Sequence, residues 1–197
     1  RDLRKATAEA LLIEDESFRF FAPTSLKQAA ATLAKGKSRV LAAATDLGVF
    51  HNKWRERIVE VVSLHLIPEL YQIEAKKGAR IRVGARVTLT ELRHRVGELA
   101  PEFARFLDLF ASPQIKNIAT LVGNVANASP IADTPPFLLV SDAELEVVGP
   151  RGKRTISIGD FFVGYRKTAL KKGEFIAMIS FDPQKAGESL TLKKVSE

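Results

Sequence analysis

The sequence predicts an α+β fold of two lobes, a small α/β lobe followed by a larger lobe with a mixed or antiparallel sheet and helices. A strand, helix and strand follow one another near the start of the chain, which is typical of a small α/β unit. Short β-rich runs separated by turn residues dominate the second half. Apolar residues make up 46% and charged residues 27% of the 197 residues, as in a folded domain with a sizeable core.

The small lobe is expected after an N-terminal stretch that begins with a helix of no clear purpose. Thr24 can cap the next helix and Gly36 can end it, because the apolar residues between them recur on one helical face. Residues 39–44, RVLAAA, are expected to form a short buried strand, and residues 58–64, IVEVVSL, are a second β-rich run. The first of these strands should lead into a polar turn at residues 45–46.

The larger lobe is expected to open with a hairpin, since residues 71–75 and 79–84 flank a Lys-Lys-Gly turn. Thr88 or Thr90 can cap a helix that follows, and a second helix is expected from Pro101. The phenylalanines of that second helix recur at helical spacing, so they are expected mainly in the core.

The last part of the chain is expected to complete the larger sheet. Residues 143–148, 155–158 and 174–181 have the composition of strands, and residues 149–152, GPRG, form a turn between the first two. Residues 190–194 are a candidate final strand. The second lobe is therefore expected to be an α+β unit.

Composition excludes several classes of site. The chain has no cysteine, which excludes disulfides, thiolate zinc sites and cysteine-ligated iron–sulfur clusters within this segment. The histidines lack metal-ligand spacing. No apolar run approaches the ~20 residues of a membrane span, and the start of the chain does not resemble a secretory signal. A cytoplasmic protein is therefore expected. The net charge of +7 is spread along the chain without a nucleic-acid motif, so neither nucleic acid nor membrane is expected as a partner.

Two segments have the character of backbone that binds a diphosphate. Residues 40–47, VLAAATDL, and residues 120–124, TLVGN, each join an apolar run to small or short polar side chains. Small side chains let backbone N–H groups approach phosphate oxygens. Such turns also serve tight packing, so either segment alone is a weak indication. The motifs GxGxxG and GxxxxGK[ST] are absent, which leaves a Rossmann site and a P-loop unsupported.

Several motifs in order resemble one family. Residues 114–136, QIKNIATLVGNVANASPIADTPP, resemble the signature of the FAD domain in xanthine dehydrogenase-like molybdenum hydroxylases. Residues 160–168, DFFVGYRKT, resemble that family's FFxGYRKT segment, and residues 41–48 are similar to its LxGGTDxG segment. Residues 21–26, FAPTSL, look like the family's entry into the domain. The resemblance spans residues 18–197.

The resemblance implies the two-lobed FAD-binding fold typified by vanillyl-alcohol oxidase and murein-synthesis reductase, with FAD extended between the lobes. It places an N-terminal extension or linker at residues 1–17 and an FAD-binding domain at residues 18–197. The lobes within that domain are expected at about 18–75 and 76–197. The chain is further expected to lack a C-terminal domain that follows in the family.

The resemblance also implies which residues contact FAD. The first run wraps the pyrophosphate and the second forms another phosphate loop. Asp133 binds the adenosine portion or nearby groups, Phe110 lies beside the cofactor, and Ile176 and Lys194 line the flavin side. The full set of expected contacts is Val40, Leu41, Ala42, Ala43, Ala44, Thr45, Asp46, Leu47, Phe110, Thr120, Leu121, Val122, Gly123, Asn124, Asp133, Ile176 and Lys194.

The residues themselves leave alternatives open. Thr120 and Asn124 could satisfy turn backbone instead, and Asp133 could cap a helix beginning near Thr134. Tyr165 and Arg166 are expected as a core residue and a surface pair. Trp54, elsewhere in the chain, is expected in packing or a subunit contact.

Two departures from the family pattern bear on cofactor binding, since Ala43 and Val122 stand where the family has glycine. Val122 is expected to be the more serious, because a branched side chain disfavours positive φ and adds bulk toward the phosphate. The departures keep open a rival function, a flavin-free structural or docking domain.

The resemblance implies an FAD-dependent oxidoreductase component that passes electrons from iron–sulfur clusters through FAD to NAD⁺ or oxygen. The molybdenum cofactor and 2Fe–2S clusters are expected only on other domains or subunits. An iron–sulfur domain and a molybdenum-binding subunit are therefore the expected partners. No side chain stands out as a catalytic acid, base, nucleophile or metal ligand.

Overall fold

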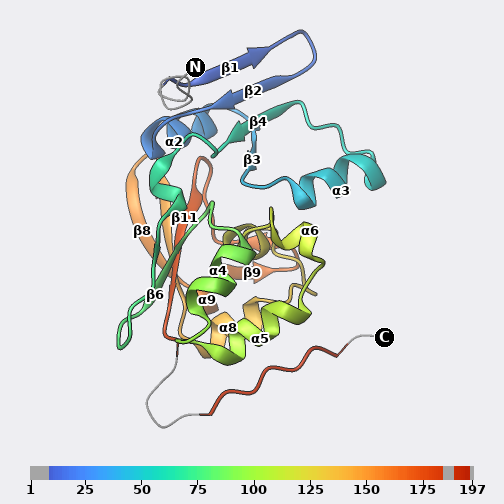
Figure 1. The fold of residues 1–197 in the computed structure, drawn as a ribbon. Helices are drawn as coiled ribbons and strands as arrows, with labels where there is room; N and C mark the ends of the chain where they lie inside the picture. Colours follow the sequence, from blue (N-terminus) through green and yellow to red (C-terminus); the bar gives the residue numbers. More distant parts are fainter. Residues whose placement is uncertain (1–8, 184–188, 196–197) are drawn as a thin grey trace, which may run out of the picture.

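The structure is a computed structural model that describes residues 9–183 and 189–195. Figure 1 shows a small sheet at one end of the molecule and a larger sheet with its helices at the other. The two-lobed α+β architecture predicted from the sequence is confirmed.

The small sheet has the strand order β1-β2-β4-β3. Its strands are β1 (Leu11–Glu14), β2 (Arg19–Ala22), β3 (Arg39–Leu41) and β4 (Glu60–Ser63). Strands β2, β4 and β3 run parallel, whereas β1 pairs antiparallel with β2 at the edge. The beginning of the predicted N-terminal helix lies outside the described residues, and residues 11–14 form a strand because their backbone groups pair with β2.

Helix α2 (Leu26–Lys35) connects β2 to β3. Its cap is Ser25, whose hydroxyl oxygen accepts a hydrogen bond from the Gln28 N–H. The prediction of Thr24 was wrong by one position, because the Thr24 N–H and hydroxyl donate to the Gln28 side-chain oxygen instead. The helix ends at Gly36 as predicted, and its apolar face is buried.

The predicted strand at 39–44 is shorter and less buried than expected. Strand β3 ends at Leu41, and the residues predicted as a polar turn form the first turn of helix α3 (Thr45–Trp54). Ala44 has φ 62° and ψ 8°, the left-handed conformation, and this residue turns the chain from strand to helix. The backbone is thus sterically strained at Ala44, between β3 and α3.

The large sheet is antiparallel throughout and has the order β5-β6-β11-β7-β8. Its strands are β5 (Ile73–Glu74), β6 (Ile81–Gly84), β7 (Glu144–Gly149), β8 (Gly152–Ser157) and β11 (Phe175–Phe181). The predicted hairpin is confirmed as β5–β6, so this sheet already begins at Ile73. A separate ribbon pairs β9 (Phe162–Gly164) with β10 (Lys167–Thr168). Residues 190–194 form no strand, although Leu190 and Leu192 pack against the core.

Short helices cover the large sheet (Figure 1). Thr88 caps α4 through a capping box with Glu91, which decides between the two predicted caps. The helical segments are η1 (Pro68–Tyr71), α4 (Leu89–Val96), α5 (Pro101–Leu109), α6 (Pro113–Lys116), α7 (Leu121–Ala126), α8 (Pro135–Val140) and α9 (Ile158–Phe161). Within the described ranges, no helix has the length and apolar character needed to cross a bilayer.

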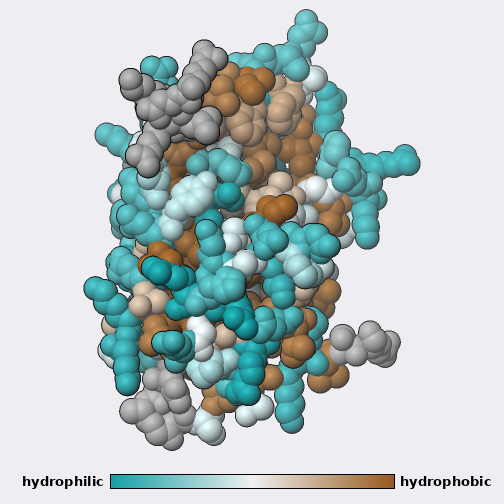
Figure 2. Space-filling view, viewed as in Figure 1, coloured by the Kyte–Doolittle hydropathy of each residue, from teal (hydrophilic) through white to brown (hydrophobic). Residues whose placement is uncertain are grey.

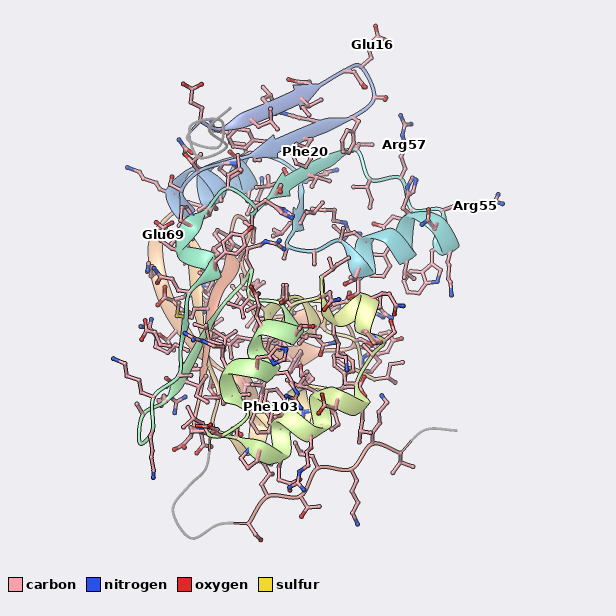
Figure 3. The ribbon with its side chains drawn as sticks, in the orientation of Figure 1. Glu16, Phe20, Arg55, Arg57, Glu69 and Phe103 are labelled. Atoms are coloured by element: carbon pink, nitrogen blue, oxygen red, sulfur yellow. The ribbon has the colours of Figure 1, made fainter. Side chains whose placement is uncertain are left out.

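One hydrophobic core joins the two sheets. It contains Val62 of β4 and Ala29 of α2 together with Val83 of β6. Its aromatic centre includes Phe103 of α5, which is labelled in Figure 3. Phe137 stacks on Phe103 with ring centroids 3.8 Å apart and meets Phe181 edge-on at 5.3 Å. Both sheets are therefore held by the same packed interior.

Apolar side chains are also exposed at the small sheet. Figure 2 shows hydrophobic surface over this end of the molecule. On β1, Leu11, Leu12 and Ile13 are 47%, 49% and 57% exposed, so this edge strand buries little on either face.

We expect Phe137→Ala to lower the free energy of unfolding by about 3–5 kcal/mol, because it leaves a cavity among fully buried rings. Leu139→Ala is the matched control, since Leu139 lies on the same helix and is half exposed. Urea denaturation followed by circular dichroism measures both. Equal losses for the two variants would contradict the assigned core.

Candidate functional site

A cavity of about 510 Å³ lies between the β3–α3 segment and the helices of the large sheet. This volume is within the range of small-molecule sites, about 300–1,000 Å³. Three stretches line it: residues 39–50, residues 110–127 and residues 170–176, with Leu64, Ala85 and Leu89 behind them. The two segments singled out in the sequence thus meet at one cavity.

The first wall is the turn into α3. Thr45, Asp46 and Leu47 form the first turn of this helix and line the cavity. The residue at the N-cap is Ala44, whose side chain has no acceptor, so the first N–H groups of the helix have no side-chain cap. The N-terminal end of a ten-residue helix therefore brings uncapped donors and a partial positive charge to this wall.

Asp46 has an unusual environment in this turn. Burial raises the pKa of its carboxyl group above the ordinary value, and the positive charge of Arg166 acts in the opposite direction. A carboxylate that is partly desolvated at a cavity wall responds strongly to any further charge placed beside it.

The second wall is the start of α7. The Thr120 hydroxyl oxygen accepts a hydrogen bond from the Gly123 N–H at 2.9 Å. A β-carbon at position 123 would lie 2.9 Å from that same oxygen, so this close contact favours glycine. Thr120 is 2% exposed and satisfies turn backbone while also lining the cavity.

Asn124 ties α7 to the beginning of α8. Its side-chain oxygen accepts hydrogen bonds from the Thr134 hydroxyl at 2.6 Å and from the Thr134 N–H at 3.4 Å. Asn124 lines the cavity, and Thr134 behind it is completely buried. The bond holds the second wall in position.

The alternative hypothesis that Asp133 caps α8 was wrong. The N-cap is Thr134, and Asp133 forms an ion pair with Lys194 instead. The Lys194 ammonium lies 5.9 Å from the centre of the Phe110 ring. Phe110 lines the cavity, whereas Asp133 and Lys194 lie outside its lining.

Of the predicted contacts, all but Leu41, Leu121, Asp133 and Lys194 line the cavity. Leu121 is fully buried in the core. Ile176, far away in the sequence, reaches the cavity from β11. The structure therefore brings most of the predicted set together in one place.

The expectation that position 122 would need positive φ was wrong, whereas the effect of the Val122 side chain on a bound phosphate stays a prediction, because Val122 lines the cavity. Val122 has helical backbone in α7, and its side chain is buried in the core at 4% exposed. The residue that adopts positive φ is Ala44, next to Ala43. A β-carbon in the left-handed region is strained by roughly 1–2 kcal/mol.

The sequence did not indicate several lining residues. Phe50 lies one helical turn after Asp46 on α3 and reaches the cavity. The sequence analysis did not predict this helix. Glu174 lines the cavity and forms a two-bond ion pair with Arg154 at 3.0 and 2.8 Å. The hydrogen bond from Arg154 lowers the pKa of Glu174. A pair twenty residues apart leaves no local pattern.

Ala44→Gly should raise the free energy of unfolding by about 0.5–1 kcal/mol, because glycine relieves the left-handed strain and this gain exceeds its own entropy cost. Ala43→Gly, the control one residue earlier, should be neutral or destabilising. Chemical denaturation compares the two. A stabilising effect at position 43 and none at position 44 would contradict the assigned turn.

The chain matches a family described as "FAD binding domain in molybdopterin dehydrogenase" over residues 16–183. It is 31% identical over 155 residues to the xanthine dehydrogenase FAD-binding subunit of Escherichia coli O157:H7, covering 75% of this chain and 51% of the relative. It is 29% identical over 198 residues to xanthine dehydrogenase/oxidase of Gallus gallus, covering 94% of this chain and 14% of the relative. The chain thus spans about half the length of the bacterial relative.

Solved structures are similar too. Reconstituted CO dehydrogenase from Oligotropha carboxidovorans superimposes with a TM-score of 0.79 at 30% identity, covering 89% of this chain and 62% of that one. Quinoline 2-oxidoreductase from Pseudomonas putida 86 gives a TM-score of 0.79 at 25% identity, covering 87% and 61%. The sequence match and the shared fold agree with the cavity between two small-residue turns, and the chain belongs to the family of FAD-binding domains of molybdopterin dehydrogenases.

Proposed function

We propose that this chain binds FAD in the cavity between its two sheets and serves as the electron-transfer domain of a xanthine dehydrogenase-like molybdenum hydroxylase. The observation that carries the proposal is the convergence of the β3–α3 turn and the start of α7 on one cavity. Its family membership and its bacterial relative, an FAD-binding subunit, support the same function.

The chain's own residues suit the parts of a dinucleotide. The uncapped N–H groups at the start of α3 would hold a diphosphate, because they combine donors with partial positive charge. The small residues Ala42, Ala43 and Gly123 let backbone come close from both walls. Ile176 and Phe175 are buried and supply apolar surface that excludes water. Bound FAD would supply the electron-accepting ring chemistry, which no side chain provides.

The other predicted contacts take different roles in this proposal. Phe110 would lie directly against the cofactor, and the Asp133–Lys194 pair would act through the ring of Phe110. Leu41 and Leu121 would fix the backbone of the two turns from behind. The proposed FAD-binding domain covers residues 18–197 and follows an extension at residues 1–17.

In the parent enzyme, electrons would arrive from 2Fe–2S clusters and leave to NAD⁺ or oxygen. An iron–sulfur domain and a molybdenum-binding subunit are the proposed partners, since the chain covers only part of its relatives. The rival function, a flavin-free docking domain, rests on Ala43 and Val122, which stand where the family pattern has glycine and which both line the cavity.

The purified chain should take up added FAD and keep its visible absorbance through gel filtration. Ala43→Asp should lower the affinity at least tenfold, about 1.4 kcal/mol, because it places a carboxylate where the diphosphate is expected. Ala31→Asp makes the same charge change on an exposed face of α2 and should bind normally. If the wild-type chain does not bind FAD, the result supports the flavin-free docking function. If Ala43→Asp binds FAD with unchanged affinity, the diphosphate does not lie beside residue 43.

FAD affinity should increase as the pH is lowered from neutral through the raised pKa of Asp46. Because the pKa of Asp46 is raised in the folded protein, its protonation stabilises the folded state at low pH. This contribution to stability is lost as the pH rises through the pKa of Asp46 in the folded protein. A nearby diphosphate would raise the pKa of Asp46 further, so binding takes up a proton. Fluorescence titrations of wild type and Asp46→Asn should differ, with a flatter profile for the variant. Identical slopes would place the diphosphate away from Asp46.

A further inference from the structure

Two exposed segments meet beside the cavity although neither was assigned a role in binding. Trp54 ends helix α3, which leaves the small sheet, and Arg166 lies at the tip of the β9–β10 ribbon. The Arg166 guanidinium lies 5.4 Å from the centre of the Trp54 ring and 6.0 Å from that of Tyr165. Both distances fall within the range of a cation–π contact.

Trp54 is connected to the cavity through its neighbour Phe50 on α3. Trp54 stacks on Phe50 with ring centroids 4.8 Å apart and an interplanar angle of 21°. Phe50 lines the cavity, as does Asp46 one turn earlier on α3. A movement of α3 that widens the cavity would therefore displace the Trp54 ring as well.

The Arg166 side is anchored to the large sheet. The Ala169 N–H donates to the Phe161 carbonyl at 2.8 Å, which closes the end of the ribbon. Arg154 of β8 donates to the Ala169 carbonyl at 2.8 Å while it holds Glu174 through two hydrogen bonds. The ribbon cannot follow α3 without disturbing these contacts, so the Arg166–Trp54 contact spans two separately anchored elements.

We propose that Trp54 and Arg166 form a clasp that holds α3 against the large sheet and retains the dinucleotide in the cavity. Arg166 is a positioning residue that acts through Trp54 and Phe50, and its positive charge also acts on Asp46 at the cavity wall. This inference rests on FAD binding in the same cavity. An exposed cation–π contact is modest, so its loss should accelerate FAD release by about two- to fivefold.

The release rate is measured by diluting the FAD-loaded chain and following the recovery of free flavin fluorescence. Arg166→Met and Trp54→Leu should each accelerate release, and the double variant should release no faster than the faster single variant, because both remove one contact. Arg166→Lys should restore slow release, since lysine keeps the charge. Arg151→Met removes an exposed arginine from the β7–β8 turn and is the matched control.

A second readout separates the clasp from general loosening of the structure. Trp54 is the only tryptophan of the chain, so its fluorescence reports the contact directly without FAD. Arg166→Met should change the emission of Trp54, whereas Arg166→Lys should leave it close to wild type, and the unfolding midpoint should move little in both.

The outcomes distinguish the two proposals. A wild-type chain that takes up no FAD overturns the proposed function and the clasp together. Normal uptake with unchanged release in Arg166→Met and Trp54→Leu overturns the clasp alone. Strictly additive effects in the double variant, or a Trp54 emission unaffected by Arg166→Met, also overturn it.

Discussion

The hydrophobic core shared by the two sheets is the constraint on which the site depends. Neither the β3–α3 turn nor the start of α7 forms a binding cavity alone, because each supplies only one wall. The core residues of β4, α2 and β6 fix the distance between these walls. Because packed interiors resist small displacements, the width of the cavity depends on core residues, some of which, such as Phe175 and Ile176, also line it.

The turn at Ala44 shows how a local cost and a useful geometry coincide. An alanine held at positive φ is strained, yet this conformation starts α3 immediately after β3, and the alanine side chain offers no acceptor to cap the first N–H groups of the helix. A capping serine or aspartate would stabilise the helix end, but its oxygen would occupy the donors. The strained alanine therefore keeps the helix end available.

Sequence reasoning predicted the two lobes, the hairpin, a helix capped by Thr88 or Thr90 and a mixed or antiparallel second sheet, because alternation, turn residues and caps are local signals. It placed both small-residue segments at a common site through their resemblance to a family pattern. It missed α3 because this helix begins at a residue without a capping side chain. It misjudged the backbone of Val122, since φ at that position follows from where α7 begins rather than from residue type. The contacts of Glu174 and Arg166 join distant segments and have no local pattern.

The hydrogen bonds from Thr134 to Asn124 also fix which end of the amide is engaged. With its oxygen held, Asn124 keeps its NH2 group as the end that remains to donate at the edge of the cavity. An aspartate at position 124 would accept the same hydrogen bonds from Thr134. Its second carboxylate oxygen would take the place of the NH2 group, so two N–H donors would be lost and a negative charge gained. The exchange of one nitrogen for one oxygen would therefore make the electrostatic potential at this edge more negative.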